Sequence, residues 1–150
     1  MYGQNSDSDS ARASALAVEL RVLFGKVSRR LREQAHPGDF TSAQKSVLLR
    51  LERDGPATVT TLARAESVRP QSLGATVAAL QSAGLVAGTP DPADGRQTIL
   101  SLTDTCREMI QTSRAAKEDW LFRMIQSKLT SGEQDELSAA VELLKRLFDS

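Results

Sequence analysis

The sequence predicts a mainly α-helical protein that carries one small β-hairpin. Aromatic residues make up only 4% of the chain, which favours helices packed through Leu, Val and Ala over an aromatic-rich β-sandwich. Apolar residues recur at three- and four-residue spacing through most of the chain, as in amphipathic helices. The exception is residues 85–103, where two β-compatible runs flank a tip rich in Pro and Asp. We therefore expect helices, then a hairpin, then further helices.

Composition excludes several classes of protein. With 40% hydrophobic and 25% charged residues, the chain of 150 residues is of ordinary globular composition and one domain in size. Cys106 and His36 are its single cysteine and histidine, so one chain can build neither a disulfide framework nor a Cys/His zinc site. We expect no metal and no cofactor. The chain has no apolar signal region and no membrane-length apolar stretch, which predicts a soluble, cytoplasmic protein without membrane contact.

The N-terminal part is predicted to be a short tail followed by one long helix. Residues 1–10 are polar and rich in Ser and Asp, which indicates a flexible tail. An amphipathic helix is expected from Ser10 to about Gln34, with Pro37-Gly38 as its stop, so this helical segment occupies residues 11–40. Its apolar positions are Leu16, Leu20, Leu23, Phe24, Val27 and Leu31.

Three shorter helices are expected next. Thr41 and Gln44 form a capping box at the start of the first, with Phe40 placed to staple it, and this helix runs to about Asp54. A short helix fits residues 60–66. Another begins with Pro70 in its first turn and is closed by Gly84. Helix, tight turn and second helix is the order of a helix-turn-helix.

A hairpin and two C-terminal helices complete the prediction. The hairpin has Asp94-Gly95 at its tip, and Leu100 and Leu102 alternate with more polar residues in its second strand. Capping boxes at Thr105-x-x-Glu108 and Thr130-x-x-Glu133 are expected to open helices near residues 104–129 and 131–148. These helices carry more apolar residues than one short helix each can hide.

The helix within VRPQSLGATVAAL, residues 68–80, has an outward face that is small and uncharged. Leu73, Val77 and Leu80 share one face and should pack on the preceding helix. The residues expected to point away are Gln71, Ser72, Ala75, Ala78 and Ala79. A helix that enters the DNA major groove needs such a face, because long charged side chains would keep it from the base edges.

Individual residues of this helix suit DNA contact. Gln71 can pair with the edge of adenine, Ser72 can bond a base or a phosphate, and Thr76 can place its methyl group against thymine. The helix N-terminus, with Arg69 beside it, suits phosphate. Gly74 costs about 1 kcal/mol against Ala inside a helix, and close backbone approach to DNA would explain it. The alternative explanation is sequence drift or helix–helix packing.

The hairpin tip offers a second candidate contact. Arg96 stands just past the tip, where an arginine can enter an adjacent minor groove. Asp94 could hold that guanidinium or simply shape the turn. Because the formal net charge is zero, any affinity for DNA must come from a few such locally placed cations.

The run TTLARAESVRPQSLGATVAALQSAGLV, followed by DPADGRQTILSLT, resembles the MarR family of winged helix-turn-helix transcriptional regulators. The resemblance implies a DNA-binding domain at residues 41–103, with residues 70–83 as recognition helix and Asp94 and Arg96 as the Asp-x-Arg wing motif. It further implies a homodimer, formed by the N-terminal helix and by C-terminal helices within residues 104–150. A pseudopalindromic operator, repression, and release of duplex DNA on binding of a small, often aromatic, ligand are also implied.

Two groups of residues carry these expectations. Those expected to face DNA are Thr60, Arg69, Pro70, Gln71, Ser72, Gly74, Ala75, Thr76, Asp94, Arg96 and Gln97. Those expected in the dimer interface are Leu16, Leu20, Leu23, Trp120, Leu121, Leu144 and Leu147. No ligand-binding residue is identified.

The chain departs from the family pattern at three positions. Arg69 occupies the cap position of the recognition helix, where Ser or Thr is common, so capping is weaker or differently arranged. Ala75 stands where many members have a basic residue aimed at DNA. Cys106 replaces a Gly that often follows the wing.

Other functions remain as alternatives. Cys106 could make the protein a redox-responsive regulator, although a lone Cys near a helix start is more often an inert small hydrophobe. His36 could line a ligand pocket or interact with a helix end. The winged helix could also be a protein–protein interaction module, which the zero net charge permits. Enzyme chemistry finds no support, because the chain has no P-loop, dinucleotide turn or nucleophile motif.

Overall fold

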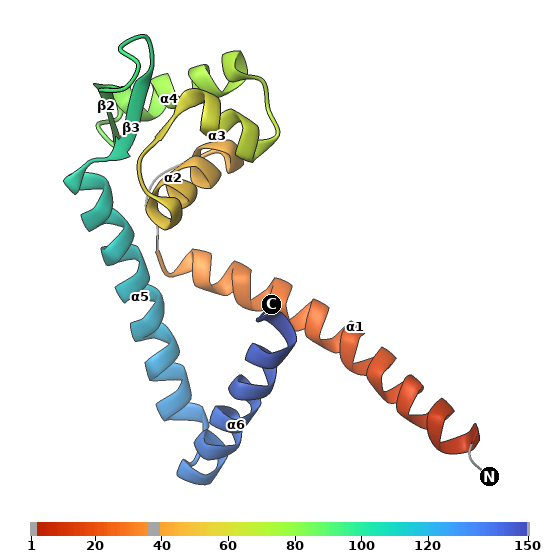
Figure 1. Cartoon of the computed structure of the whole chain (residues 1–150). Coiled ribbons are helices and arrows are strands. Elements are labelled where there is room, and N and C mark those ends of the chain that lie inside the picture. Colours follow the sequence, from red (N-terminus) through yellow and green to blue (C-terminus); the bar gives the residue numbers. More distant parts are fainter. Residues whose placement is uncertain (1–2, 36–39, 150) are drawn as a thin grey trace. The chain divides into compact units, whose positions relative to one another are not determined.

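The computed structural model describes residues 3–35 and 40–149, and they form six helices and three short strands (Figure 1). The elements in chain order are α1 (Gly3–Glu33), α2 (Ser42–Asp54), β1 (Ala57–Thr58), α3 (Val59–Glu66), α4 (Pro70–Ser82), β2 (Val86–Pro90), β3 (Thr98–Leu102), α5 (Asp104–Lys128) and α6 (Ser131–Phe148). They divide into a central unit, His36–Arg114, and a terminal unit, Met1–Ala35 with Ala115–Ser150. The mainly helical fold class predicted from the sequence is confirmed.

Helix α1 begins earlier than expected. It is helical from Gly3, whereas the sequence predicted a flexible tail over residues 1–10 and a helix from Ser10. Nothing between residues 4 and 24 stops the helix from growing toward the N-terminus, since this stretch contains no Pro or Gly. Arg12 also lies 4.0 Å from Asp9, one turn away on the same face. The predicted stop at Pro37-Gly38 lies outside the described residues.

Local capping explains where α2 begins and ends. Thr41 and Gln44 form the predicted capping box, with Gln44 N–H donating to Thr41 Oγ1 at 3.1 Å and Thr41 N–H to Gln44 Oε1 at 3.0 Å. Phe40 packs against the buried core. Gly55 ends the helix with φ 85°, a conformation that favours glycine.

Helix α3 starts one residue earlier than predicted because Thr58 is its N-cap. At its other end Ser67 adopts the left-handed conformation, with φ 55° and ψ 40°. The N–H of Val68 donates to Ala63 O, and that of Ser67 to Arg64 O, which is the Schellman pattern. This left-handed residue makes the tight turn between α3 and α4.

Helix α4 matches the predicted recognition helix within a residue. Pro70 is in its first turn, and Gly84, with φ 75°, follows its last turn. The N–H of Gly84 donates to Gln81 O and that of Leu85 to Leu80 O, a second Schellman pattern. The chain is thereby directed out of the helix and into β2.

The predicted hairpin is one part of a three-stranded antiparallel sheet of order β1-β3-β2. Strands β2 and β3 pair with Val86 opposite Leu102 and Pro90 opposite Thr98. Strand β1, which was not predicted from the sequence, pairs Ala57 with Leu100. Two residues are too few to show an alternating pattern in a sequence.

The central unit contains the buried core. Its members are Val47, Leu48, Leu51, Leu62, Ala63, Leu73, Val77, Leu80, Leu85, Val86, Leu100, Leu102 and Cys106. Helices α2, α3 and α4 and the sheet all contribute, and α4 supplies the predicted face of Leu73, Val77 and Leu80. Burying each such aliphatic side chain stabilises the fold by about 1.5–3 kcal/mol.

Of the two capping boxes predicted for the C-terminal helices, one is confirmed and one is wrong. Thr130 and Glu133 cap α6 as predicted, with the N–H of Glu133 donating to Thr130 Oγ1 at 3.2 Å. Helix α5 begins at Asp104, and it is Thr103 rather than Thr105 whose hydroxyl accepts a first-turn N–H, that of Cys106, at 3.2 Å. The last residue of the wing thus also caps α5.

Replacement of Ser67 by glycine should stabilise the protein. A left-handed conformation costs a residue with a Cβ about 1–2 kcal/mol, and glycine avoids that cost at the expense of a more flexible unfolded chain. We expect Ser67→Gly to raise the free energy of unfolding by up to about 1 kcal/mol, measured by chemical denaturation. Ser82→Gly, in the last turn of α4, is the control and should lower it. Equal losses in both variants would contradict the role given to Ser67.

Candidate nucleic-acid interface

The outward face of α4 is as small and uncharged as the sequence predicts. Its solvent-exposed members are Gln71, Ser72, Ala75, Ala78 and Ala79. Gly74 and Thr76 lie half-buried at its edges, and the Thr76 hydroxyl donates to Ser72 O at 3.5 Å. A Cβ added at Gly74 would meet nothing within 4 Å, so packing inside the chain does not explain this glycine. The alanines of this face are exposed, so packing among the described residues does not account for their small size either.

The N-terminus of α4 has backbone N–H groups that the helix itself does not use. Arg69 is the N-cap by backbone conformation and makes no side-chain capping bond. Its carbonyl accepts the N–H of Leu73 at 3.1 Å, which begins the helical ladder. The N–H groups of Gln71 and Ser72 precede that ladder, and the exposed Arg69 guanidinium lies next to them in the chain. This end of the helix therefore suits an anion.

The wing tip is shaped by Asp94. Its carboxylate Oδ1 accepts the backbone N–H of Arg96 at 3.1 Å, and its carbonyl accepts that of Gln97 at 2.9 Å. Gln97 O in turn accepts the N–H of Asp91 at 2.9 Å, which closes the loop. Of the two roles considered for Asp94, the structure thus supports turn formation. Arg96 and Gln97 are exposed at the tip.

Gly88 allows the two wing strands and α4 to approach closely. It lies in β2 opposite Leu100. A Cβ added there would come 2.6 Å from the Thr98 methyl carbon and 3.3 Å from Gln81 Nε2. Any larger residue would therefore require the Thr98 side chain of β3 to shift, and the Gln81 side chain of α4 to give slightly. The sequence shows only a glycine in a strand, which signals a bulge or a close approach without saying to what.

The predicted DNA-facing residues fall into two groups and one outlier. One group lies in or next to the first two turns of α4, and the other, Asp94, Arg96 and Gln97, lies at the wing tip. The first group consists of Arg69, Pro70, Gln71, Ser72, Gly74, Ala75 and Thr76. Thr60 lies apart from both, exposed in the first turn of α3.

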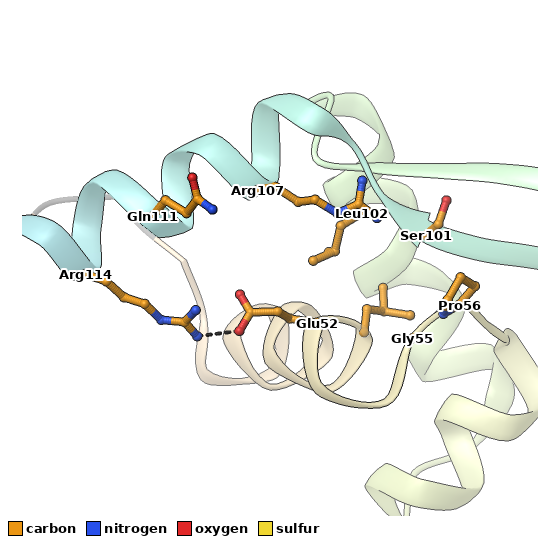
Figure 2. Close-up of a pocket in the computed structure, with 9 residues that line it drawn as sticks. Glu52, Gly55, Pro56, Ser101, Leu102, Arg107, Gln111 and Arg114 are labelled. Atoms are coloured by element: carbon orange, nitrogen blue, oxygen red, sulfur yellow. Dashed lines mark hydrogen bonds and ion pairs between the residues drawn. The ribbon is translucent and has the colours of Figure 1, made fainter.

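A cavity of about 340 Å³ lies in the central unit between α2, β3 and α5 (Figure 2). Figure 2 shows Arg107, Gln111 and Arg114 following one another along α5, with Glu52 of α2 hydrogen-bonded to Arg114. The other residues that line the cavity are Leu51, Gly55, Pro56, Ser101 and Leu102. The sequence analysis identified no ligand site, because the lining comes from three separate segments.

The terminal unit leaves its apolar residues in contact with solvent. None of its described residues is fully buried. Of the residues predicted for a dimer interface, Leu16, Leu23 and Leu147 are 51%, 51% and 65% exposed, Leu121 is exposed, and Leu20, Trp120 and Leu144 are half-buried. Phe24 of α1 and Phe148 of α6 stack edge-on, with ring centroids 5.8 Å apart.

Comparison with known proteins identifies the family. A sequence model of the MarR family matches residues 39–97. An HTH-type transcriptional regulator of Mycobacterium tuberculosis is 33% identical over 134 residues, 89% of this chain and 93% of that protein. The HTH-type transcriptional repressor NicR of Pseudomonas putida is 28% identical over 131 residues, 87% and 80% of the two chains. The crystal structure of a Pseudomonas aeruginosa protein matches with a TM-score of 0.78 at 33% sequence identity. The match covers 93% of this chain and 97% of that one.

The chain belongs to the MarR family of winged helix-turn-helix transcriptional regulators. It is therefore a DNA-binding regulator and not an enzyme, as the sequence predicted. In this MarR-family protein α3 and α4 are the helix-turn-helix and β2–β3 the wing. No helix within residues 3–35 and 40–149 is long and apolar enough to cross a bilayer.

The structure explains the departures from the family pattern. Arg69 supplies only backbone capping, and Ala75 leaves an exposed position without a cation. Cys106 is completely buried in the core, and burial raises the pKa of its thiol, both of which oppose a reactive thiolate. The redox alternative is thereby disfavoured. His36 lies outside the described residues.

One polar cluster in the helix-turn-helix was not predicted. Glu66, the last residue of α3, accepts hydrogen bonds from Ser46 Oγ and from Arg50 Nε of α2, both at 2.6 Å. Its side chain is 15% exposed, and these donors, the Arg50 guanidinium first, hold its pKa below the usual range. The cluster links α2 to the residue before the left-handed turn at Ser67.

Loss of the Glu66 charge should destabilise the protein in a pH-dependent way. A carboxylate with a lowered folded-state pKa stabilises the fold above its unfolded-state pKa, and that stability is lost as the pH falls through the folded-state value. We expect Glu66→Gln to lower the free energy of unfolding by about 1–2 kcal/mol at pH 7, with the difference from wild type shrinking below about pH 4.5. Denaturation at several pH values measures this. The exposed Glu118→Gln is the control, and a loss that does not depend on pH would contradict the assignment.

Proposed function

We propose that this protein is a sequence-specific, ligand-responsive repressor that binds a pseudopalindromic operator as a homodimer in the cytoplasm. The observation that carries the proposal is the exposed face of α4, which is small and uncharged although no residue in the described part of the chain packs against it. The rest follows from what such a face can contact.

The face of α4 suits the DNA major groove. Ala75, Ala78 and Ala79 let the helix come close to the base edges, and Gly74 removes a side chain at the edge of that face. Gln71 and Ser72, in the first turn, can then reach bases or phosphates with their side chains. The free N–H groups of the same turn and the Arg69 guanidinium favour a phosphate, which sets the register of the helix on the duplex.

The wing suits an adjacent minor groove. Asp94 uses its carboxylate and its carbonyl to hold the loop, and no ion pair to Arg96 occurs among the described residues. The Arg96 guanidinium is therefore free for DNA, where a narrow groove concentrates negative potential. The other candidate contacts named from the sequence, Thr60 and Gln97, are exposed and available.

The terminal unit suits pairing with a second copy of the chain. It has no fully buried residue among those described, although α1, α5 and α6 all carry large apolar side chains. Apolar surface removed from water contributes about 25 cal/mol per Å², and the part that exceeds the entropic cost of association favours pairing. A twofold dimer would then place two recognition helices in successive major grooves, about one helical turn apart.

Repression and response to a ligand are the finer parts of the proposal. The relative NicR is named a repressor, which supports the same sign of regulation here. The cavity between α2, β3 and α5 is a candidate effector site, since its lining offers two arginines, an amide and apolar surface. Release of DNA requires only that the ligand prefer a conformation with another half-site spacing.

Selection of bound duplexes from a random-sequence pool tests the proposal. Recovery of an inverted repeat with about 10 bp between half-site centres would support a dimeric reader of the groove. Enrichment of a single, non-repeated site would contradict the dimer. Absence of any enrichment would contradict specific DNA binding by the chain alone and favour use of the winged helix for a protein partner.

Truncation of the wing arginine should weaken DNA binding. Arg96→Ala removes the one cation at the wing tip, so we expect operator affinity to fall at least tenfold and the salt dependence of binding to lessen by about one phosphate contact. Fluorescence anisotropy over a range of salt concentrations measures both. Arg12→Ala, which removes the same charge from α1, is the control and should bind normally. Unchanged affinity in Arg96→Ala would rule out the wing contact.

Two substitutions at Gly74 separate folding from DNA binding. Gly74→Ala should raise the free energy of unfolding by about 1 kcal/mol, because the site has open space and alanine favours the helix. Gly74→Lys should also fold, yet its long side chain should hold α4 away from the bases and reduce operator binding to the nonspecific level. Thermal denaturation and anisotropy report the two effects. Normal specific binding by Gly74→Lys would show that α4 does not approach DNA along this edge.

A further inference from the structure

Thr103 lies between the end of β3 and the start of α5, and all of its polar groups are engaged. Its hydroxyl donates to Gly84 O at 2.7 Å and accepts the N–H of Cys106 at 3.2 Å. Its backbone N–H donates to Leu85 O at 3.1 Å, and its carbonyl accepts the N–H of Arg107 at 3.0 Å. Two of these four bonds reach the residues that follow α4, and the other two reach the first turn of α5.

These bonds join the recognition helix to α5. Gly84 and Leu85 are the residues that terminate α4, whereas Cys106 and Arg107 belong to the first turn of α5. One hydroxyl group therefore bonds both helices. Because a helix N-cap fixes the direction of the first turn, the tie constrains the orientation of α5 relative to α4.

Helix α5 has a second attachment further along. Arg114 is hydrogen-bonded to Glu52 of α2, and between the two attachments Met109 and Ile110 pack on the core. Residues 104–114 thus belong to the central unit, and α5 continues without a break to Lys128 in the terminal unit.

We propose that Thr103 is a positioning residue that fixes the direction in which α5 leaves the winged domain, and thereby sets the half-site spacing that the dimer accepts. The inference rests on the proposed dimeric function. It assigns to the hydroxyl a role in operator selection beyond stability, because a small change of angle at the first turn of a helix becomes a large displacement 24 residues later, at Lys128, at 1.5 Å per residue. The cavity lies beside this joint, since Ser101, Leu102 and Arg107 line it.

Operators of varied spacing test the proposal. Half-sites obtained by selection are placed with centres about 8–13 bp apart, and the affinity of the full-length protein for each is measured. We expect wild type and Thr103→Ser, which keeps both hydroxyl bonds, to favour one spacing about tenfold over its neighbours. Thr103→Val, which keeps the shape and loses both bonds, should reduce that preference to about threefold or less. Thr105→Val, an exposed threonine two residues on, is the control and should match wild type.

A further variant guards against loss of folding in Thr103→Val. Thr103→Asp remains a good N-cap for the Cys106 N–H but cannot donate to Gly84 O, so it should fold and show the same reduced preference. Retention of the wild-type spacing profile by folded Thr103→Asp would overturn the role of Thr103 while leaving the dimeric function intact. A wild type without any spacing preference would overturn the dimeric function and the inference with it.

Discussion

Burial of one face of the recognition helix is the constraint on which the central unit depends. Leu73, Val77 and Leu80 join the core that α2, α3 and the sheet complete. These three side chains hold α4 in place, and its opposite face is left exposed to solvent. That face carries alanines, a glutamine and the half-buried Gly74. The glycine lowers helix propensity by about 1 kcal/mol relative to alanine. One face of α4 is thus packed in the core, and the other is exposed and, in the proposed function, available to DNA.

A protein without net charge can bind DNA only if its cations are well placed. The structure meets this condition locally. Asp94 accepts the hydrogen bonds that form the turn, and no ion pair to Arg96 occurs within residues 3–35 and 40–149. Arg69 stands at the N-terminus of α4, beside N–H groups that precede the helical ladder. Arg50, in contrast, is not available to DNA, because its guanidinium is paired with Glu66. Position, more than number, thus determines which arginines are available to a phosphate backbone.

The two units differ in how they become stable. The central unit buries thirteen apolar residues of its own, whereas the terminal unit has none fully buried among those described. In the proposed dimer, folding of the terminal unit and association would be linked, so apparent stability would rise with protein concentration. Helix α5 extends from the central unit into the terminal unit, and its first turns are held by the bonds of Thr103 and Arg114. In the proposed function, these bonds connect operator spacing with the effector site.

The sequence by itself determined the features that depend on neighbours a few residues apart. Capping boxes at Thr41 and Thr130, the buried face of α4 and the Asp94 turn all rest on local spacing, which a helix or a tight turn imposes directly. The tertiary structure decided the rest. The bond of Thr103 to Gly84, the pairing of β1, and the Glu66 and Arg114 bonds join residues 16 to 62 positions apart. Such pairs carry no periodic signal, because folding alone brings them together.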